Sequence, residues 1–188
     1  GYSFIMRDAH GIRPAYYYID GEVIVAASER AAIRTTFNVG ENEVHELMPG
    51  NALIIDDKGG YTIEQIIEPK ERRACSFERI YFSRGGDEKI YRERIALGHY
   101  LSKIVLDRIE KDLKNTIFSY IPNTAEVAFY GLIKGMEEYL NAIKVERILS
   151  WGKDVDAEKL NEMVNRKIRQ EKIAIKDVKL RTFITADA

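Results

Sequence analysis

The chain changes character at Gly85-Gly86, and this change limits the possible folds more than any other feature. Before it, short runs rich in β-branched and aromatic residues alternate with turn-forming residues, which is typical of strands and hairpins. After it, apolar residues recur at spacings of three and four, which is typical of helices. We therefore predict two domains, a β-rich domain over residues 1–86 and an α/β domain over residues 87–188, with an α+β and α/β fold class.

The β-rich part contains two expected hairpins. In AYYYIDGEVIVAAS, two strand-like runs flank Asp20-Gly21, a dipeptide that favours a two-residue type I′ turn. In residues 51–67, the turn is expected at Lys58-Gly59-Gly60. Between the hairpins, SERAAIRTTF predicts a short helix with Ser28 as its N-cap. A further strand is expected in residues 75–82, CSFERIYF, although the alternation of apolar and polar residues is imperfect there.

The second part shows an alternation of helices and short strands. Helices are expected at residues 91–113, 125–140 and 156–170, the last with Asp156 as N-cap. Short strands are expected at residues 116–122 and 172–175. Because a helix–strand–helix order is typical of parallel sheets, this part predicts an α/β architecture.

Composition and charge exclude several classes of function. Lys plus Arg number 29 and Asp plus Glu 30, so the net charge of −1 does not indicate a nucleic-acid partner. No apolar run approaches the ~20 residues that span a bilayer, and the start does not have the pattern of a signal peptide. A single cysteine rules out an internal disulfide and fits a reducing compartment. We expect a cytoplasmic protein without a membrane partner.

Histidine and cysteine are the residues that most often carry chemistry, and here they are sparse. His10 and His99 have no cysteine or carboxylate cluster at ligand spacing, so we expect no metal site. Cys75 is either a nucleophile or a small buried side chain. The buried alternative is the more common one for a lone cysteine, and we expect Cys75 to be a core residue.

Three short stretches, taken in order, resemble the amidophosphoribosyltransferase family. They are RDAHGIRP at residues 7–14 followed by ASE, then MPG at 48–50 with CSFERIYFSR at 75–84, and RTFI at 181–184. The family patterns are RDPNGIRP and C-x-F-E-x-[IV]-Y-F-A-R. The residues of this structural signature are Arg7, Asp8, Gly11, Arg13, Glu78 and Arg84.

The resemblance implies a specific architecture. Residues 1–86 resemble the later half of a class II glutamine amidotransferase domain, an N-terminal-nucleophile hydrolase fold. Residues 87–188 resemble the first half of a type I phosphoribosyltransferase domain, with a helical insertion at about residues 141–172. The chain begins in strand-like sequence and ends in a polar run. We therefore expect an internal fragment of a longer protein, or a diverged paralogue.

The resemblance also implies a function for the longer protein. In the family, ammonia released from glutamine displaces pyrophosphate from phosphoribosyl pyrophosphate in purine synthesis. The longer protein would be a pentosyltransferase that acts on small molecules with Mg²⁺, and a homo-oligomer. The alternative is a non-catalytic regulatory or interaction relative that keeps the scaffold.

For the chain alone, the resemblance implies no catalytic residue and no cofactor. The family nucleophile is an N-terminal cysteine, whereas the chain starts at Gly1 and Cys75 matches an internal strand residue. The acidic ribose-phosphate motif of the transferases is also missing. Its nearest imitation, IIDDKGG at residues 54–60, lies in an expected hairpin.

Two segments supply candidate binding residues. Asn123, Thr124 and Ala125 match a pyrophosphate loop, although Asn123 replaces the family's acidic residue. The structural alternative is that Asn123 or Thr124 caps the following helix. Lys176, Lys179, Arg181 and Thr182 match a flexible loop that covers the substrate, and the alternative is a solvated tail.

The signature residues Arg7, Asp8 and Arg13 are expected to serve architecture. We predict that they form a buried ion-pair network around a turn at Gly11, because buried charges need partners.

Overall fold

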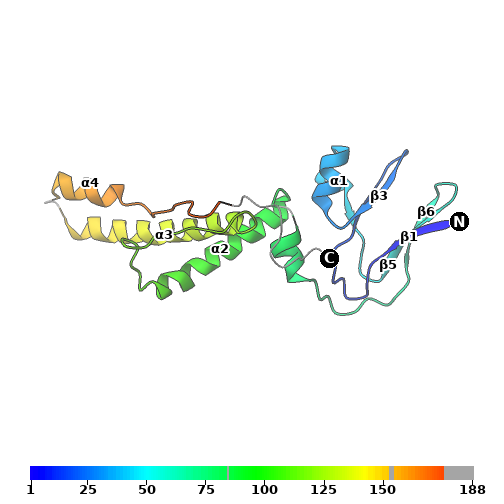
Figure 1. The fold of residues 1–188 in the computed structure, drawn as a ribbon, viewed down its shortest axis with the longest axis horizontal. Helices are drawn as coiled ribbons and strands as arrows, with labels where there is room; N and C mark the ends of the chain where they lie inside the picture. Colours follow the sequence, from blue (N-terminus) through cyan, green and yellow to red (C-terminus); the bar gives the residue numbers. More distant parts are fainter. Residues whose placement is uncertain (84, 153–154, 176–188) are drawn as a thin grey trace, which may run out of the picture. The chain divides into compact units, whose positions relative to one another are not determined.

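The computed structural model describes residues 1–83, 85–152 and 155–175. The chain forms two compact units, Gly1–Ile90 and Tyr91–Ala188, which are described separately below. The sequence places this boundary at residue 86. The whole is a mixed α/β structure with small antiparallel sheets (Figure 1).

The first sheet of the unit Gly1–Ile90 has the strand order β1-β5-β6. It contains β1 (Tyr2–Met6), β5 (Asn51–Asp56) and β6 (Tyr61–Gln65), all antiparallel. Leu53 on the central strand is fully buried. The predicted hairpin at residues 51–67 is confirmed. The Asp56 carboxylate closes its turn by accepting hydrogen bonds from the N–H groups of Lys58 and Gly60, both at 2.8 Å.

The second sheet has the order β3-β2-β4 and contains β2 (Tyr16–Ile19), β3 (Ile24–Ala27) and β4 (His45–Glu46). The predicted hairpin is confirmed, but the predicted two-residue turn at Asp20-Gly21 is wrong, since Ile19 pairs with Ile24. Instead, the Asp20 carboxylate accepts the N–H groups of Glu22 and Val23, at 2.7 and 2.8 Å. A side chain that satisfies two turn donors removes the need for the type I′ geometry.

Two predictions for this unit need correction, one about the start of a helix and one about a strand. Helix α1 (Arg30–Phe37) begins after Glu29, which makes no side-chain cap, so Ser28 is not the N-cap. The strand predicted at residues 75–82 is wrong, because Glu78–Phe82 form a π-helix, η2. Phe77 and Tyr81 explain the difference. They are four residues apart, and one turn of helix brings their rings into a stack at 4.9 Å. In a strand they would also lie on one face, but the extended chain would hold them too far apart to stack. A short 3-10 helix, η1 (Glu41–Glu43), precedes β4.

The unit Tyr91–Ala188 is helical in the residues described. Helix α2 (Glu88–Arg108) starts in the preceding unit, and α3 (Glu126–Ser150) and α4 (Ala157–Asn165) follow. The predicted cap of α4 is confirmed, since the Asp156 carboxylate accepts the N–H of Glu158 at 3.1 Å. Helix α3 runs past its predicted end at residue 140 and so occupies part of the expected insertion.

The strands predicted at residues 116–122 and 172–175 are not formed. A single parallel bridge joins Phe118 to Gln170, through hydrogen bonds of 2.9 and 3.0 Å. No parallel sheet therefore exists among residues 91–152 and 155–175. One bridge does not amount to a sheet, because a parallel strand needs a neighbour of several residues to pair its backbone groups.

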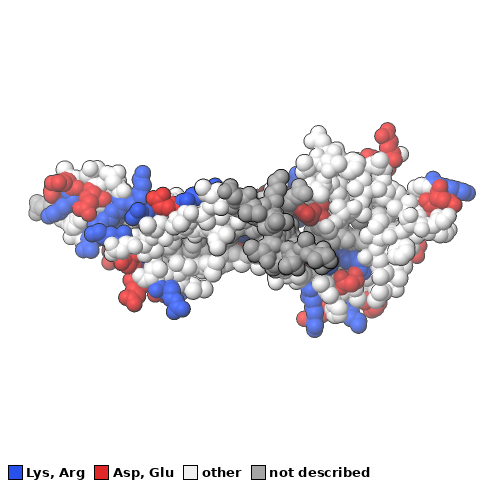
Figure 2. Space-filling view, in the orientation of Figure 1, with Lys and Arg blue, Asp and Glu red and all other residues white. Residues whose placement is uncertain are grey.

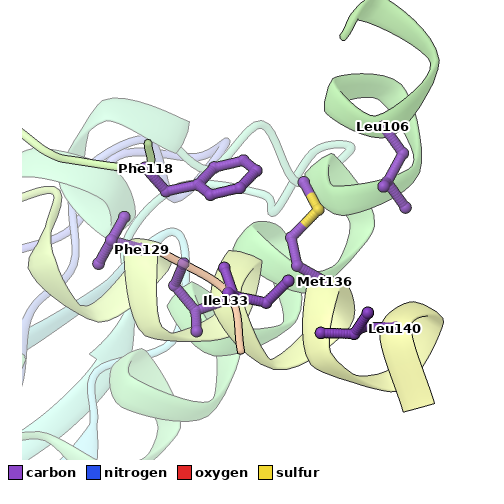
Figure 3. Close-up of a cluster of buried hydrophobic side chains, with 7 residues drawn as sticks. Leu106, Phe118, Phe129, Ile133, Met136 and Leu140 are labelled. Carbon is purple, nitrogen blue, oxygen red and sulfur yellow. The ribbon is translucent and has the colours of Figure 1, made fainter. Parts of the chain in front are cut away.

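The core of this unit lies between α2, α3 and the segment around Phe118 (Figure 3). Met136 is fully buried, and the cluster around it consists of Leu106, Phe118, Phe129, Ile133, Leu140 and Ile168. Helices α2 and α3 pack closely, because a Cβ on Gly131 would overlap the backbone oxygen of Ile95.

The surface is charged and mixed. At the end of the molecule formed by α3 and α4, basic and acidic side chains are interspersed in the view of Figure 2. In the part of the chain that the structure describes, no helix combines the length and apolarity needed to cross a membrane.

Candidate functional site

The predicted pyrophosphate loop is a tight turn that leads directly into α3. The peptide bond between Pro122 and Asn123 is cis, and Asn123 lies exposed. The carbonyl of Asn123 accepts the N–H of Glu126 at 3.2 Å. The N-cap of α3 is Ala125, which provides no side-chain acceptor. The predicted alternative, that Asn123 or Thr124 caps this helix through its side chain, is therefore wrong.

An uncapped helix start has a chemical consequence. The first N–H groups of a helix have no intrahelical acceptor, and together with the helix dipole they favour an anion. The N–H of Glu126 donates to the Asn123 carbonyl, and no side chain caps the N–H groups that follow it, so those groups are open to water or to a bound anion.

Glu126, the first residue of α3, already places a negative charge beside this turn. Its carboxylate accepts hydrogen bonds from the hydroxyls of Tyr120 at 2.7 Å and Tyr130 at 2.8 Å. The bond to Glu126 raises the pKa of Tyr120 to about 12. The same two hydroxyls, Tyr120 first, lower the pKa of Glu126, and Lys172 adds a smaller effect in the same direction. The ionised carboxylate therefore competes electrostatically with any anion at the turn.

The other predicted binding residues cannot be placed. Lys176, Lys179, Arg181 and Thr182 lie outside the described residues, as does Arg84 of the structural signature.

The remaining signature residues lie together in the unit Gly1–Ile90. Arg7 is 3% exposed and donates to the Glu46 carboxylate and the Leu47 carbonyl, both at 2.7 Å. It also donates to the carbonyls of Arg13 at 3.0 Å and Gly11 at 3.4 Å. Its ionic partner is thus Glu46 and not the predicted Asp8, because the turn folds Asp8 back onto its own backbone.

Asp8 instead shapes the turn. Its carboxylate accepts the N–H groups of His10 and Ile12, both at 2.9 Å. Gly11 has φ +60°, and a Cβ there would come within 2.8 Å of Pro49. The turn therefore requires glycine at this position. Arg13 reaches from it to pair with the buried Glu78 at 2.7 Å.

Cys75 lines a cavity beside this network, and the prediction that it is a core residue is wrong, since its side chain is only half-buried. Its backbone N–H donates to the Ile12 carbonyl at 2.9 Å. The cavity has a volume of about 50 Å³. This is far below the roughly 300–1,000 Å³ of common ligand sites, so the cavity suits water molecules and not an amino-acid substrate.

Sequence reasoning missed a second charged cluster in the same unit. Arg30, 8% exposed, donates from two nitrogens to the Asp87 carboxylate at 2.8–3.0 Å and pairs with Glu41 at 3.1 Å. Asp87 also accepts the N–H groups of Lys89 and Ile90 at the start of α2, at 3.0 and 3.3 Å. An Asp before a helical pattern is a recognisable N-cap signal. Its pairing with a residue 57 positions away is not visible in a sequence.

Comparisons with known proteins give one consistent family name. No family model matches the chain. The amidophosphoribosyltransferase of Synechocystis sp. is 33% identical over 105 residues, which are 52% of this chain and 20% of that protein. The Bacillus subtilis enzyme of the same name is 39% identical over 80 residues, 43% of this chain and 16% of that protein. The chain spans about a fifth of the length of these relatives.

Solved structures agree with the sequence relatives. One, described as the structure of the allosteric regulatory enzyme of purine biosynthesis, has a TM-score of 0.58 and 25% identity, and covers 72% of this chain and 28% of that one. A glutamine phosphoribosylpyrophosphate amidotransferase from B. subtilis, complexed with ADP and GMP, has a TM-score of 0.58 at 22% identity, over 89% of this chain and 36% of that one. The latter shows likeness of fold alone. The resemblance predicted from the three sequence motifs is confirmed: over part of its length, the chain is similar to amidophosphoribosyltransferases.

Proposed function

We propose that the chain is part of an amidophosphoribosyltransferase-like protein. In this proposal, Gly1–Ile90 corresponds to the later part of a glutamine amidotransferase domain, and Tyr91–Ala188 to the first part of a type I phosphoribosyltransferase domain. The partial match to several enzymes of that name supports it, as does the order of the motifs along the chain. The longer protein would transfer glutamine-derived ammonia to phosphoribosyl pyrophosphate and would assemble as a homo-oligomer.

The single observation that carries a binding role is the uncapped start of α3 directly after the turn. Asn123, Thr124 and Ala125 would bind the pyrophosphate group there, through backbone N–H groups and the helix dipole. Mg²⁺ would enter with the pyrophosphate; among the described residues there is no group of three or more His, Cys, Asp or Glu that could hold it. Mg²⁺ commonly binds through phosphate oxygens and retained waters, with few protein ligands.

For the chain by itself we expect neither glutamine hydrolysis nor phosphoribosyl transfer. The surroundings of Cys75 support this expectation, since the cavity beside it is too small for glutamine. Lys176, Lys179, Arg181 and Thr182 would close over the substrate only in the longer protein.

The alternative is a non-catalytic regulatory or interaction relative. One observation favours it: the Glu126 carboxylate lies at the first residue of α3, where an anion would bind. Asn123, which replaces the acidic residue of the family's pyrophosphate loop, also favours a non-catalytic relative.

A titration with pyrophosphate tests the proposal. We expect saturable shifts of the amide resonances of residues 123–128 in ¹⁵N–¹H spectra. Glu126→Gln removes the competing charge and should tighten binding by about threefold, on the order of the 0.3–1 kcal/mol of a charge at a helix start. Glu137→Gln, an exposed acid further along α3, is the matched control and should leave affinity unchanged.

Two results would count against this proposal. Absence of saturable shifts at residues 123–128 would remove the binding role. Ammonia release from glutamine by the chain alone would contradict the expected lack of hydrolysis.

A further inference from the structure

A second, larger cleft lies within the unit Gly1–Ile90, apart from the small cavity beside Cys75. It is open to solvent, has a volume of about 500 Å³ and is predominantly polar. Side chains from β2, α1 and η1–β4 line it, together with Arg72 and Lys89 from later in the unit. A space of this size admits a small ligand, because ligand sites commonly measure about 300–1,000 Å³.

The two carboxylates of the cleft are each bound by two cations. Glu46 pairs with the buried Arg7 at 2.7 Å and with Arg72 at 2.9 Å. Glu41 pairs with Arg30 at 3.1 Å and with Lys89 at 3.6 Å. Their negative charges are therefore already neutralised and do not repel an incoming anion.

The charge that remains is positive. Arg30, Arg72 and Lys89 line the cleft with the two carboxylates, and the charges of these five residues leave a formal excess of one positive charge. Behind the lining, Arg7 and Asp87 offset each other, so the excess stands.

Two of these cations have donors facing solvent. Arg72 is 55% exposed, and one of its nitrogens is engaged by Glu46. Lys89 is 65% exposed and lies at the longer distance from Glu41. A guanidinium has five N–H donors and an ammonium three, so each has donors beyond those used by one carboxylate.

From this arrangement we infer that the cleft binds a small phosphate-bearing anion. Arg72 would bind the phosphate through its planar guanidinium, which matches two phosphate oxygens at once, and Lys89 would add a point charge. Glu46, which Arg7 also binds, holds Arg72 in place. The site is distinct from the turn at residues 121–125, and it does not depend on the function proposed above.

The test is a titration of the whole chain with inorganic pyrophosphate and, separately, inorganic phosphate, followed by ¹⁵N–¹H spectra. The amide resonances of residues 41–46 and 72 report this cleft, whereas those of residues 123–128 report the turn, so the two sites are scored separately. We expect saturable shifts at residues 41–46 with both anions, and weaker binding at higher salt.

The neighbouring arginines provide a matched pair of variants. Arg72→Gln should weaken binding at residues 41–46 by at least about tenfold, because it removes the charge-assisted hydrogen bonds of the guanidinium. Arg73→Gln removes a neighbouring cation that is 69% exposed, pairs with Glu71 at 3.4 Å and does not line the cleft. It should change the affinity by less than about twofold.

Lys89→Gln gives a second, independent probe and should also weaken binding. Absence of saturable shifts at residues 41–46 would overturn the inference. Equal losses in Arg72→Gln and Arg73→Gln would overturn it as well, because they would show a response to net charge and not to a site.

Discussion

At the scale of single residues, the unit Gly1–Ile90 is organised by two buried arginines. Arg7 and Arg30 are 3% and 8% exposed, and each is satisfied by carboxylates that lie far away in the sequence. A buried charge that loses its partner is costly, whereas the intact pair contributes little beyond a hydrophobic equivalent. Arrangements of the chain that separate these pairs are therefore disfavoured, and the arginines mainly select the one arrangement of the segments that they join.

Asp87→Ala tests this role. The change leaves the buried Arg30 guanidinium with its ion pair to Glu41 and removes an acceptor at the start of α2, so we expect a loss of about 3 kcal/mol in the free energy of unfolding. Urea unfolding followed by circular dichroism measures it. Glu71→Ala, which breaks an exposed pair with Arg73, should cost less than about 0.5 kcal/mol. A similar cost for both variants would contradict the structural role of Asp87.

The bond between Tyr120 and Glu126 predicts a pH dependence. The pKa of Tyr120 rises to about 12 in the folded chain because Glu126 accepts its hydroxyl hydrogen. The stabilisation is thus complete below pH 10 and is lost as the pH rises toward 12. The same bond lowers the pKa of Glu126. Its contribution to stability is therefore present above pH 4.5 and is lost as the pH falls through the lowered pKa of the folded chain.

Tyr120→Phe should therefore flatten the stability profile at both ends, as measured by thermal unfolding across pH. Tyr100→Phe, at a tyrosine that is 75% exposed, is the control and should leave the profile unchanged. An unchanged profile in Tyr120→Phe would show that the bond does not contribute.

At the scale of elements, glycines set the approach of α2 and α3. Cβ atoms on Gly98 and Gly131 would overlap backbone oxygens of the opposite helix, at Ala128 and Ile95, and a Cβ on Gly135 would overlap the Ser102 side chain. Glycine normally weakens a helix by about 1 kcal/mol relative to alanine. Here the close approach that it permits, which brings Met136 and its neighbours into contact, offsets that cost.

Gly131→Ala should accordingly destabilise the chain, although alanine is the better helix former. We expect a net loss of about 1–2 kcal/mol, since overpacking costs about 1–3 kcal/mol and helix propensity returns part of it. Asn141→Ala, at an exposed position on α3, is the control and should be neutral or slightly stabilising. A stabilised Gly131→Ala variant would contradict the close packing of the two helices.

At the scale of the whole molecule, much apolar surface is exposed. Tyr2 and Phe4 on β1 are 79% and 68% exposed, and Ile104 on α2 is 65% exposed. Exposed apolar side chains on one strand, such as Tyr2 and Phe4, are typical of surfaces that other protein covers. This exposure accords with the proposal that the chain is part of a longer protein, as does its match to about a fifth of its relatives.

The sequence by itself determined those features that depend on neighbouring residues. Both hairpins, the Asp156 cap and the positions of the main helices follow from local turn chemistry and periodicity, and the ordered motifs predicted the resemblance to amidophosphoribosyltransferases that the comparisons show. The prediction of a strand at residues 75–82 was wrong. Aromatic side chains favour strands in general, but here Phe77 and Tyr81 stack across one helical turn.

Only the tertiary structure decided which charges meet. The pairing of Arg7 with Glu46 and of Arg30 with Asp87 joins positions 39 and 57 residues apart. The cleft with Arg72 and Lys89, and the Tyr120–Glu126 bond beside an uncapped helix, likewise arise from the path of the chain in space. The physical reason is that local propensities act over a few residues, whereas ion pairs and cavities depend on segments brought together by folding.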